Sequence, residues 1–152
     1  AGDGPEIKNL EKRIHDFGLS DQVFLLGRVS EALKWNLLDR ADIFCLPSID
    51  RAEAFGISII EAMASGLPII TTRVKGSGMN FVNRHNQTGF SVPPKDSGAL
   101  ADAANLLFDN PDMMRAFGDN ALRRYQTHFQ TQIVMKLVKS IYQKLLNPIT
   151  KI

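Results

Sequence analysis

The sequence lacks the features by which several classes of protein are recognised. It has a single cysteine, Cys45, so no disulfide and no cluster of cysteine ligands forms within the chain. It has little excess charge, because 18 Lys and Arg stand against 16 Asp and Glu, and its basic residues are scattered. A concentrated basic stripe is therefore missing, which argues against a nucleic-acid-binding protein. The longest apolar runs, such as Ile57 to Ala64, are broken by a charge well before the roughly 18 residues of a membrane span.

What the sequence does contain is typical of a globular protein. Its 152 residues, 44% of them hydrophobic, are enough for one domain with a buried core, so we expect a single domain over residues 1–152 and exclude disorder. The lone Cys45 lies within the apolar run Ile43–Leu46, which favours a reducing, cytoplasmic compartment.

Glycine and proline divide the chain into alternating helical and extended blocks. Amphipathic spacing, N-caps and proline starts predict helices over Pro5–Phe17, after Ser30, and over Ile57–Ser65, Ala99–Phe108, Pro111–Thr127 and Gln130–Leu146. Continuous apolar runs predict strands at Val23–Leu26, Ile43–Leu46, Pro68–Thr72 and Gly89–Val92. This alternation predicts an α/β fold, a Rossmann-like parallel sheet flanked by helices, with C-terminal helices. Ligands of such sheets bind beyond the carboxyl ends of the strands.

The loop after the Ile43–Leu46 run holds the most informative pattern. Glu53 precedes a predicted helix that starts at Gly56, and Glu61 lies about one turn inside it. The unpaired N–H groups at such a helix start suit a diphosphate, and flanking carboxylates suit sugar or ribose hydroxyls. On spacing alone an ordinary explanation competes, because acidic residues near a helix start also complement the helix dipole.

The residues around this pair carry a family resemblance. The segments 46–48 and 53–70, with their Glu53 and Glu61, resemble the signature of glycosyltransferase family 4, whose members are retaining enzymes of the GT-B fold that use nucleotide sugars. The segments 2–5, 23–29, 41–44 and 88–94 are similar to further motifs of that family, in the same order and spacing.

The resemblance implies a role for each matching position. Glu53 is expected to face the donor sugar as the catalytic carboxylate, and Glu61 to hold the ribose hydroxyls. The Arg28–Val29 loop is expected to lie against the base. The amides expected to contact the donor are those of Phe55 and Gly56, at sugar oxygens, and of Ile57 and Ser58, at the diphosphate.

The resemblance also implies a reaction and partners. We expect the donor-binding domain of an enzyme that moves a hexose, with retention, from a nucleotide-diphosphate sugar to a glycan or lipid-linked acceptor, in bacterial surface polysaccharide or lipopolysaccharide synthesis. No metal or other cofactor and no nucleic acid is expected. Arg123, Arg124, Lys136 and Lys139 leave open a peripheral contact with the inner face of the cytoplasmic membrane, although such residues are usually just solvated.

Two departures from the family pattern stand out. The segment 75–82 lacks the Gly-Gly turn and Pro-Glu that usually face the sugar. The N-terminal acceptor domain and the first strand and helix of the C-terminal domain have no counterpart, so we expect little or no turnover by this chain alone. A fragment, a second chain that fills the gap and a rearranged or swapped fold are all open explanations.

Three alternative functions are left open by the sequence. A nucleotide-sugar-binding module or remnant would bind the donor without transferring it. A GT-B epimerase or phosphorylase should lack the arrangement of Glu53, Gly56 and Glu61. A dinucleotide-binding domain would need a third glycine after Gly2 and Gly4, which the sequence does not have.

Overall fold

The computed structural model describes residues 1–146. The chain divides into two compact units, Ala1–Arg40 and Ala41–Ile152. Whether the two together form the single domain expected from the sequence stays a prediction.

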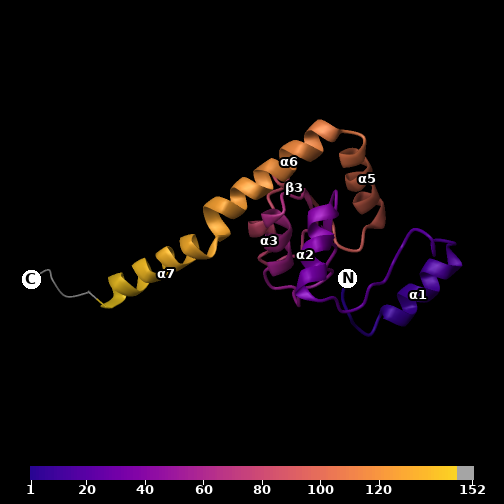
Figure 1. Ribbon diagram of the computed structural model, residues 1–152, viewed down its shortest axis with the longest axis horizontal. Helices are drawn as coiled ribbons and strands as arrows, with labels where there is room; N and C mark the ends of the chain where they lie inside the picture. The colour runs from indigo at the N-terminus through magenta and orange to yellow at the C-terminus, as the bar shows by residue number, and fades with distance from the viewer. Residues whose placement is uncertain (147–152) are drawn as a thin grey trace, which may run out of the picture. The chain divides into compact units, whose positions relative to one another are not determined.

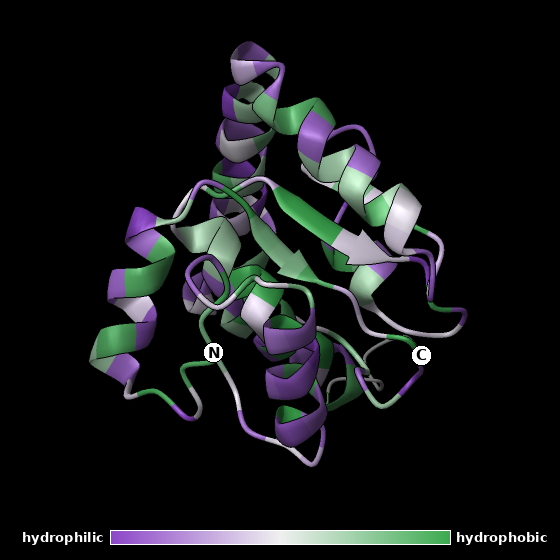
Figure 2. Ribbon diagram, turned by 90° about the vertical axis from the view of Figure 1, so that its right-hand side faces the viewer, coloured by the Kyte–Doolittle hydropathy of each residue, from purple (hydrophilic) through white to green (hydrophobic). Residues whose placement is uncertain are grey.

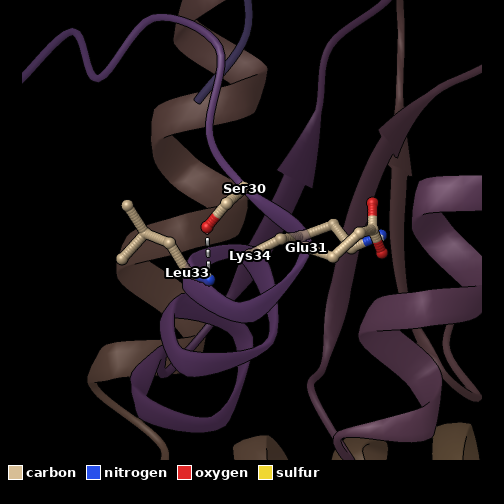
Figure 3. A network of polar contacts seen from close by, with 4 residues as sticks. All are labelled: Ser30, Glu31, Leu33 and Lys34. Atoms are coloured by element: carbon tan, nitrogen blue, oxygen red, sulfur yellow. Dashed lines mark hydrogen bonds and ion pairs between the residues drawn. The ribbon is translucent and has the colours of Figure 1, made fainter.

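The first unit contains two helices, α1 (Ile7–Asp16) and α2 (Glu31–Arg40). The predicted cap of α2 is confirmed, because the Ser30 hydroxyl accepts a hydrogen bond from the Leu33 amide at 3.3 Å, beside a 2.7 Å ion pair of Lys34 with Glu31 (Figure 3). No residue of α1 is buried. This unit therefore has regular helices but little core of its own.

The predicted strand at Val23–Leu26 is wrong for this structure. The segment is irregular, and all four of its side chains are exposed. A strand is stabilised by hydrogen bonds to a neighbouring strand, and no described segment pairs with this one. Its apolar composition alone does not make it a strand.

The second unit is built on a parallel sheet that confirms the α/β prediction. Its three strands, β1 (Phe44–Leu46), β2 (Ile69–Thr72) and β3 (Gly89–Val92), are ordered β1-β2-β3 and all run parallel. Every residue of β2 and β3 is buried. The strands are largely in the green of apolar residues in Figure 2, whereas green and purple alternate around the helices.

Helices cover this sheet and extend beyond it (Figure 1). They are α3 (Ile57–Ala64), α4 (Met79–Val82), α5 (Ser97–Phe108), α6 (Pro111–Arg124), a single π-helical turn η1 (Tyr125–Phe129) and α7 (Thr131–Leu146). All but α4 and η1 match predicted helices. The four-residue α4 is too short to give a periodic apolar pattern, and the predicted helix that ran to Thr127 changes to the π turn at Tyr125.

The two faces of the sheet are buried in different ways. On one face, Ile70, Phe90 and Val92 pack against Leu107 of α5 and Phe117 of α6, and the rings of Phe90 and Phe117 lie 5.3 Å apart. This side holds one apolar cluster of the unit. Because strand side chains alternate, Thr71 and Ser91 belong to the opposite face.

On this opposite face, which also includes the buried Ile69, a buried side-chain amide links α4 to the strands. The side-chain amide of Asn83 donates to the Thr71 hydroxyl at 2.9 Å and to the Phe90 carbonyl at 2.9 Å, and its oxygen accepts from the Thr88 hydroxyl at 2.8 Å. Buried polar groups stabilise a fold only when they are paired in this way. Asn83 thus fixes the end of α4 to β2 and β3.

Arg124 also holds α4 in place, by hydrogen bonds to the carbonyl oxygens of its last two residues. Its guanidinium donates to the carbonyl oxygens of Val82 at 2.9 Å and Phe81 at 2.6 Å, and it stacks over the rings of Phe81 and Phe129. Burial, with a smaller contribution from nearby Arg84, lowers the pKa of Arg124. Arg124 is therefore a packed residue rather than a solvated one.

Candidate functional site

The candidate site lies where two neighbouring parallel strands end. The loop 47–56 follows β1, and the loop 73–78 follows β2. Because β1 and β2 are adjacent and parallel, their carboxyl ends bring the two loops together, at the edge of an α/β sheet where ligands bind.

Glu53 and Gly56 form the turn that leads into α3. The Gly56 amide donates to Oε1 of Glu53 at 2.8 Å. Gly56 has φ +85° and ψ 61°, a left-handed conformation that favours glycine, and a Cβ there would lie 2.5 Å from Cδ1 of Ile59. Glycine is therefore required at this position, and its amide, expected on a sugar oxygen, is held by the Glu53 carboxylate.

The N-terminus of α3 presents donors that the described part of the chain does not use. Among the described residues, the amides of Phe55, Ile57 and Ser58 have no hydrogen-bond partner, whereas the Ile59 amide donates to the Gly56 carbonyl at 3.0 Å. Ile57 is 69% exposed. Such donors, together with the positive end of the helix dipole, suit an anion such as a phosphate.

The helix-dipole explanation for the two carboxylates fits only one of them. Glu53 accepts from the Gly56 amide and so does serve the helix start. The first turn of α3 contains no acidic residue, because Glu61 lies further along the helix, where it is half-buried. A dipole effect falls off beyond the first turn, so Glu61 needs another explanation.

The loop after β2 holds the Glu53 loop in place, which the sequence did not reveal. The Ser77 hydroxyl donates to the Glu53 carbonyl at 2.6 Å, and the Thr72 hydroxyl donates to the carbonyl of Ser48. The Met79 amide in turn donates to the Ser77 oxygen at 3.2 Å. In the sequence, the same segment stands out only for its departure from the family pattern.

Two glycines let these loops approach each other. The Gly78 amide donates to the Ala54 carbonyl at 2.7 Å, and a Cβ on Gly78 would lie 2.7 Å from the Phe55 ring. Gly76 has φ +81°, and a Cβ there would lie 3.1 Å from Nε of Arg51. The Gly-Ser-Gly sequence is thus explained by close packing against loop 47–56. The Gly-Ser-Gly sequence could have indicated this contact only if the two loops had also been assigned to adjacent strands.

The predicted site residues fall in both units. Those from Glu53 to Ser58, with Glu61, lie together at the start of α3. Arg28 and Val29 belong to the first unit, where they follow Gly27, whose carbonyl accepts from the Gly2 amide at 2.7 Å. Arg28 is exposed and Val29 is half-buried. Their expected contact with the base stays a prediction.

The described residues offer no obvious metal site or membrane span. Within residues 1–146, no three His, Cys, Asp or Glu side chains are grouped so that they could hold a metal ion. Within the same residues, no helix is long and apolar enough to cross a membrane. The expectation that no metal is needed stays a prediction.

The comparisons with known proteins agree on one family. The sequence pattern described as glycosyl transferases group 1 matches residues 1–124. The chain is 31% identical over 146 residues to O-antigen chain mannosyltransferase C of Escherichia coli, an alignment that covers 96% of this chain and 39% of that protein.

Solved structures share the fold. Sucrose-phosphate synthase of Thermosynechococcus elongatus superposes with a TM-score of 0.84 at 28% identity, over 98% of this chain and 38% of that one. HepE of Anabaena, solved in complex with UDP-glucose, superposes with a TM-score of 0.81 at 24% identity, over 93% of this chain and 39% of that one. The chain thus spans about two fifths of the length of each of these proteins.

Proposed function

The chain belongs to the glycosyl transferases group 1 family, and from that premise we propose that it forms the donor-binding part of a retaining, GT-B-type hexosyltransferase. Its substrate is a nucleotide-diphosphate sugar, and the acceptor is a glycan or a lipid-linked glycan. The similarity to an O-antigen chain mannosyltransferase supports a place in surface polysaccharide or lipopolysaccharide synthesis. The single cysteine fits a cytoplasmic site of action.

One observation carries the proposal: the amides at the start of α3 have no partner among the described residues and lie beside the Glu53 loop. In the proposed complex the amides of Ile57 and Ser58 bind the diphosphate, and that of Phe55 reaches a sugar oxygen. Fixed N–H dipoles stabilise the charge that grows on a departing diphosphate, so no metal is required for this step.

Glu53 and Gly56 are proposed to exchange partners when the donor binds. At present the Gly56 amide donates to Glu53. A sugar hydroxyl that donates to the Glu53 carboxylate, while another sugar oxygen accepts from Gly56, replaces that contact without leaving either group unpaired. Glu53 then lies beside the sugar, where its charge stabilises positive charge at the anomeric carbon.

The remaining contacts of the donor follow from the family roles. Glu61, half-buried on α3, accepts from the ribose hydroxyls, and Arg28 and Val29 lie against the base. UDP-glucose bound to HepE makes UDP one candidate among the nucleotides. Because the chain spans about two fifths of its relatives, we expect it to bind the donor by itself without transferring the sugar.

Calorimetric titration tests this proposal. The chain is titrated with UDP, GDP and ADP and with their hexose conjugates, beside Glu61→Ala and a matched control, Asp102→Ala, which removes an exposed carboxylate from α5. We expect one nucleotide to bind. Loss of a hydrogen-bonding carboxylate should weaken it by about tenfold or more in Glu61→Ala, and the control should leave it unchanged.

A nucleotide that binds equally well to all three proteins would contradict the proposed site. Transfer of sugar to water or acceptor at an ordinary rate by this chain alone would contradict the expectation that it binds the donor without transferring the sugar. A thermal melt of each variant separates a lost contact from a lost fold.

A further inference from the structure

Arg51 is the one basic residue of loop 47–56, and its side chain lies against the neighbouring loop. Its Nε and Cζ atoms are only 3.1 and 3.2 Å from the position that a Cβ of Gly76 would occupy. Because Gly76 has no side chain, the guanidinium lies directly over the backbone of that turn. Arg51 therefore belongs to the pair of loops that forms the candidate site.

The contacts between the two loops put Arg51 and the start of α3 on either side of Glu53. At one end, Arg51 lies over Gly76. In the middle, the Ser77 hydroxyl donates to the Glu53 carbonyl at 2.6 Å. At the other end, Gly56 leads into α3. The order along the site is thus the start of α3, then Glu53, then Arg51.

No carboxylate of the described residues forms an ion pair with this guanidinium. The two acidic residues of its own loop are engaged by backbone amides. Oδ1 of Asp50 accepts from the Ala52 amide at 2.8 Å, and Oε1 of Glu53 accepts from a second amide at 2.8 Å. The facing loop, 73–78, contains no acidic residue. Because Arg51 is also exposed, its N–H groups are available to a ligand.

In the proposed donor complex, Arg51 lies at the sugar and not at the diphosphate. The amides at the start of α3 are assigned to the diphosphate, and Glu53, the next group along, is assigned to the sugar. Arg51 comes after Glu53 in this order, where the end of the sugar furthest from the diphosphate is expected. A guanidinium presents several N–H donors in a fixed plane and no acceptor, so it suits neighbouring hydroxyl oxygens.

The other basic residues of the two loops are less suited to this position. Arg73 lines a hollow whose other residues include His85 and Ser91 and none from loop 47–56. Lys75 has an ammonium group on a flexible stem, which is a point charge without the planar fork of a guanidinium. Arg51 is therefore the cation that contacts both loops.

We propose that Arg51 is a further substrate-binding residue of this site, and that its guanidinium donates hydrogen bonds to hydroxyl oxygens of the transferred sugar. This role rests on the proposed function, because it requires the donor to bind at the start of α3. It makes Arg51 a determinant of the sugar that the site prefers, whereas the nucleotide is recognised elsewhere.

Calorimetry that compares a nucleotide with its sugar conjugate tests the role of Arg51. The chain is titrated with UDP and UDP-glucose, GDP and GDP-mannose, and ADP and ADP-glucose, beside Arg51→Gln and Arg51→Lys. For the nucleotide that binds, Arg51→Gln should weaken the conjugate about tenfold and leave the bare diphosphate unchanged, because the lost hydrogen bonds are made only to the sugar. Arg51→Lys keeps the charge without the fork, and its affinity for the conjugate should fall between the two.

A matched control and a second readout complete the test. Arg73→Gln removes the same charge from the facing loop, and its affinities should equal those of the unchanged chain. A thermal melt identifies any variant that fails to fold. NMR of the unchanged chain needs no variant to fold: the Nε–H signal of Arg51 should shift with the sugar conjugate and stay in place with the bare diphosphate.

Several results would overturn the role of Arg51 while leaving the donor site intact. They are equal losses for conjugate and bare diphosphate in Arg51→Gln, no loss for either, the same selective loss in Arg73→Gln, and an Nε–H signal that does not respond to the sugar. A bare diphosphate that binds while its conjugate does not would also overturn it. If no nucleotide binds the unchanged chain, the proposed function fails, and the role of Arg51 fails with it.

Discussion

Two apolar segments of nearly the same character behave differently in the two units. Val23–Leu26 and Ile43–Leu46 are both continuous apolar runs of four residues. Only the second contains a strand, β1, because it pairs with β2, whereas the first is irregular and exposed. An apolar run therefore becomes a strand only where a neighbouring strand pairs with it. The second unit holds such neighbours within itself, and the described residues of the first do not.

The largest expected effect comes from a change that prevents β3 from pairing with β2. A side chain at Gly89 would collide with the backbone of Ile69 on β2, so Gly89→Val should cost about 4 kcal/mol or more and unfold the second unit. Gly18→Ala is the matched change in the first unit. It meets nothing within 4 Å at φ +65°, so only the left-handed backbone opposes it, at a cost of about 1–2 kcal/mol. Urea unfolding followed by circular dichroism measures both, and a Gly89→Val chain as stable as Gly18→Ala would refute the comparison.

The next effect compares one buried and one exposed aliphatic side chain. Ile70 is 1% exposed in β2, and Leu25 is 38% exposed. Ile70→Ala should lower the free energy of unfolding by about 2–5 kcal/mol because it leaves a cavity, whereas Leu25→Ala should change it by about 0.5 kcal/mol or less. Urea unfolding curves of the two variants measure both changes in the free energy of unfolding. An equal loss from Leu25→Ala would mean that Val23–Leu26 is packed after all.

A smaller effect concerns the site that the pairing of β1 and β2 creates. Ser77→Ala removes the hydrogen bond to the Glu53 carbonyl, which should weaken donor binding about fivefold, the value of one hydrogen bond. Ser20→Ala, at an exposed position of the first unit, is the control and should have no effect. Calorimetry with the nucleotide that the chain binds gives both affinities. Unchanged affinity in Ser77→Ala would show that the second loop does not position Glu53.

The smallest effect compares helix caps in the two units. Asp96 caps α5 through a 2.9 Å bond from the Ala99 amide, and Ser30 caps α2 at 3.3 Å. Asp96→Ala should destabilise the second unit by about 1 kcal/mol, because α5 packs on the core. Ser30→Ala should not lower the stability of the second unit, and its only effect should be faster hydrogen exchange of the backbone amides within α2. Global destabilisation by Ser30→Ala would mean that the first unit unfolds together with the second.

Much of the fold could be predicted because local patterns and tertiary structure agree in the second unit. Gly56 and Gly66 mark the limits of α3, and the Asp96 cap marks the start of α5. The missed α4 is too short to show a period, and its position depends on two distant contacts, that of its C-cap Asn83 with Phe90 of β3 and that of Arg124 with the carbonyl of Val82. The strand at Val23–Leu26 was wrong because its pairing partner cannot be read from its own residues.

The candidate site was predictable in part for the same reason. The positions from Glu53 to Glu61 are contiguous in sequence, so a motif identifies them together. The hydrogen bonds that Ser77 and Gly78 donate to loop 47–56 depend on β1 and β2 being neighbours in the sheet. No local sequence pattern contains that information. The bond between Glu53 and the Gly56 amide is likewise a matter of side-chain orientation.

Amide NMR of the chain during titration with UDP, GDP and ADP tests the central claim most directly, since that claim assigns the donor to the unpaired amides of α3. We predict that one nucleotide shifts the amide signals of Ile57 and Ser58 first and furthest, with smaller changes at Gly56 as its bond to Glu53 exchanges. Shifts that saturate elsewhere and leave these amides unchanged would contradict it.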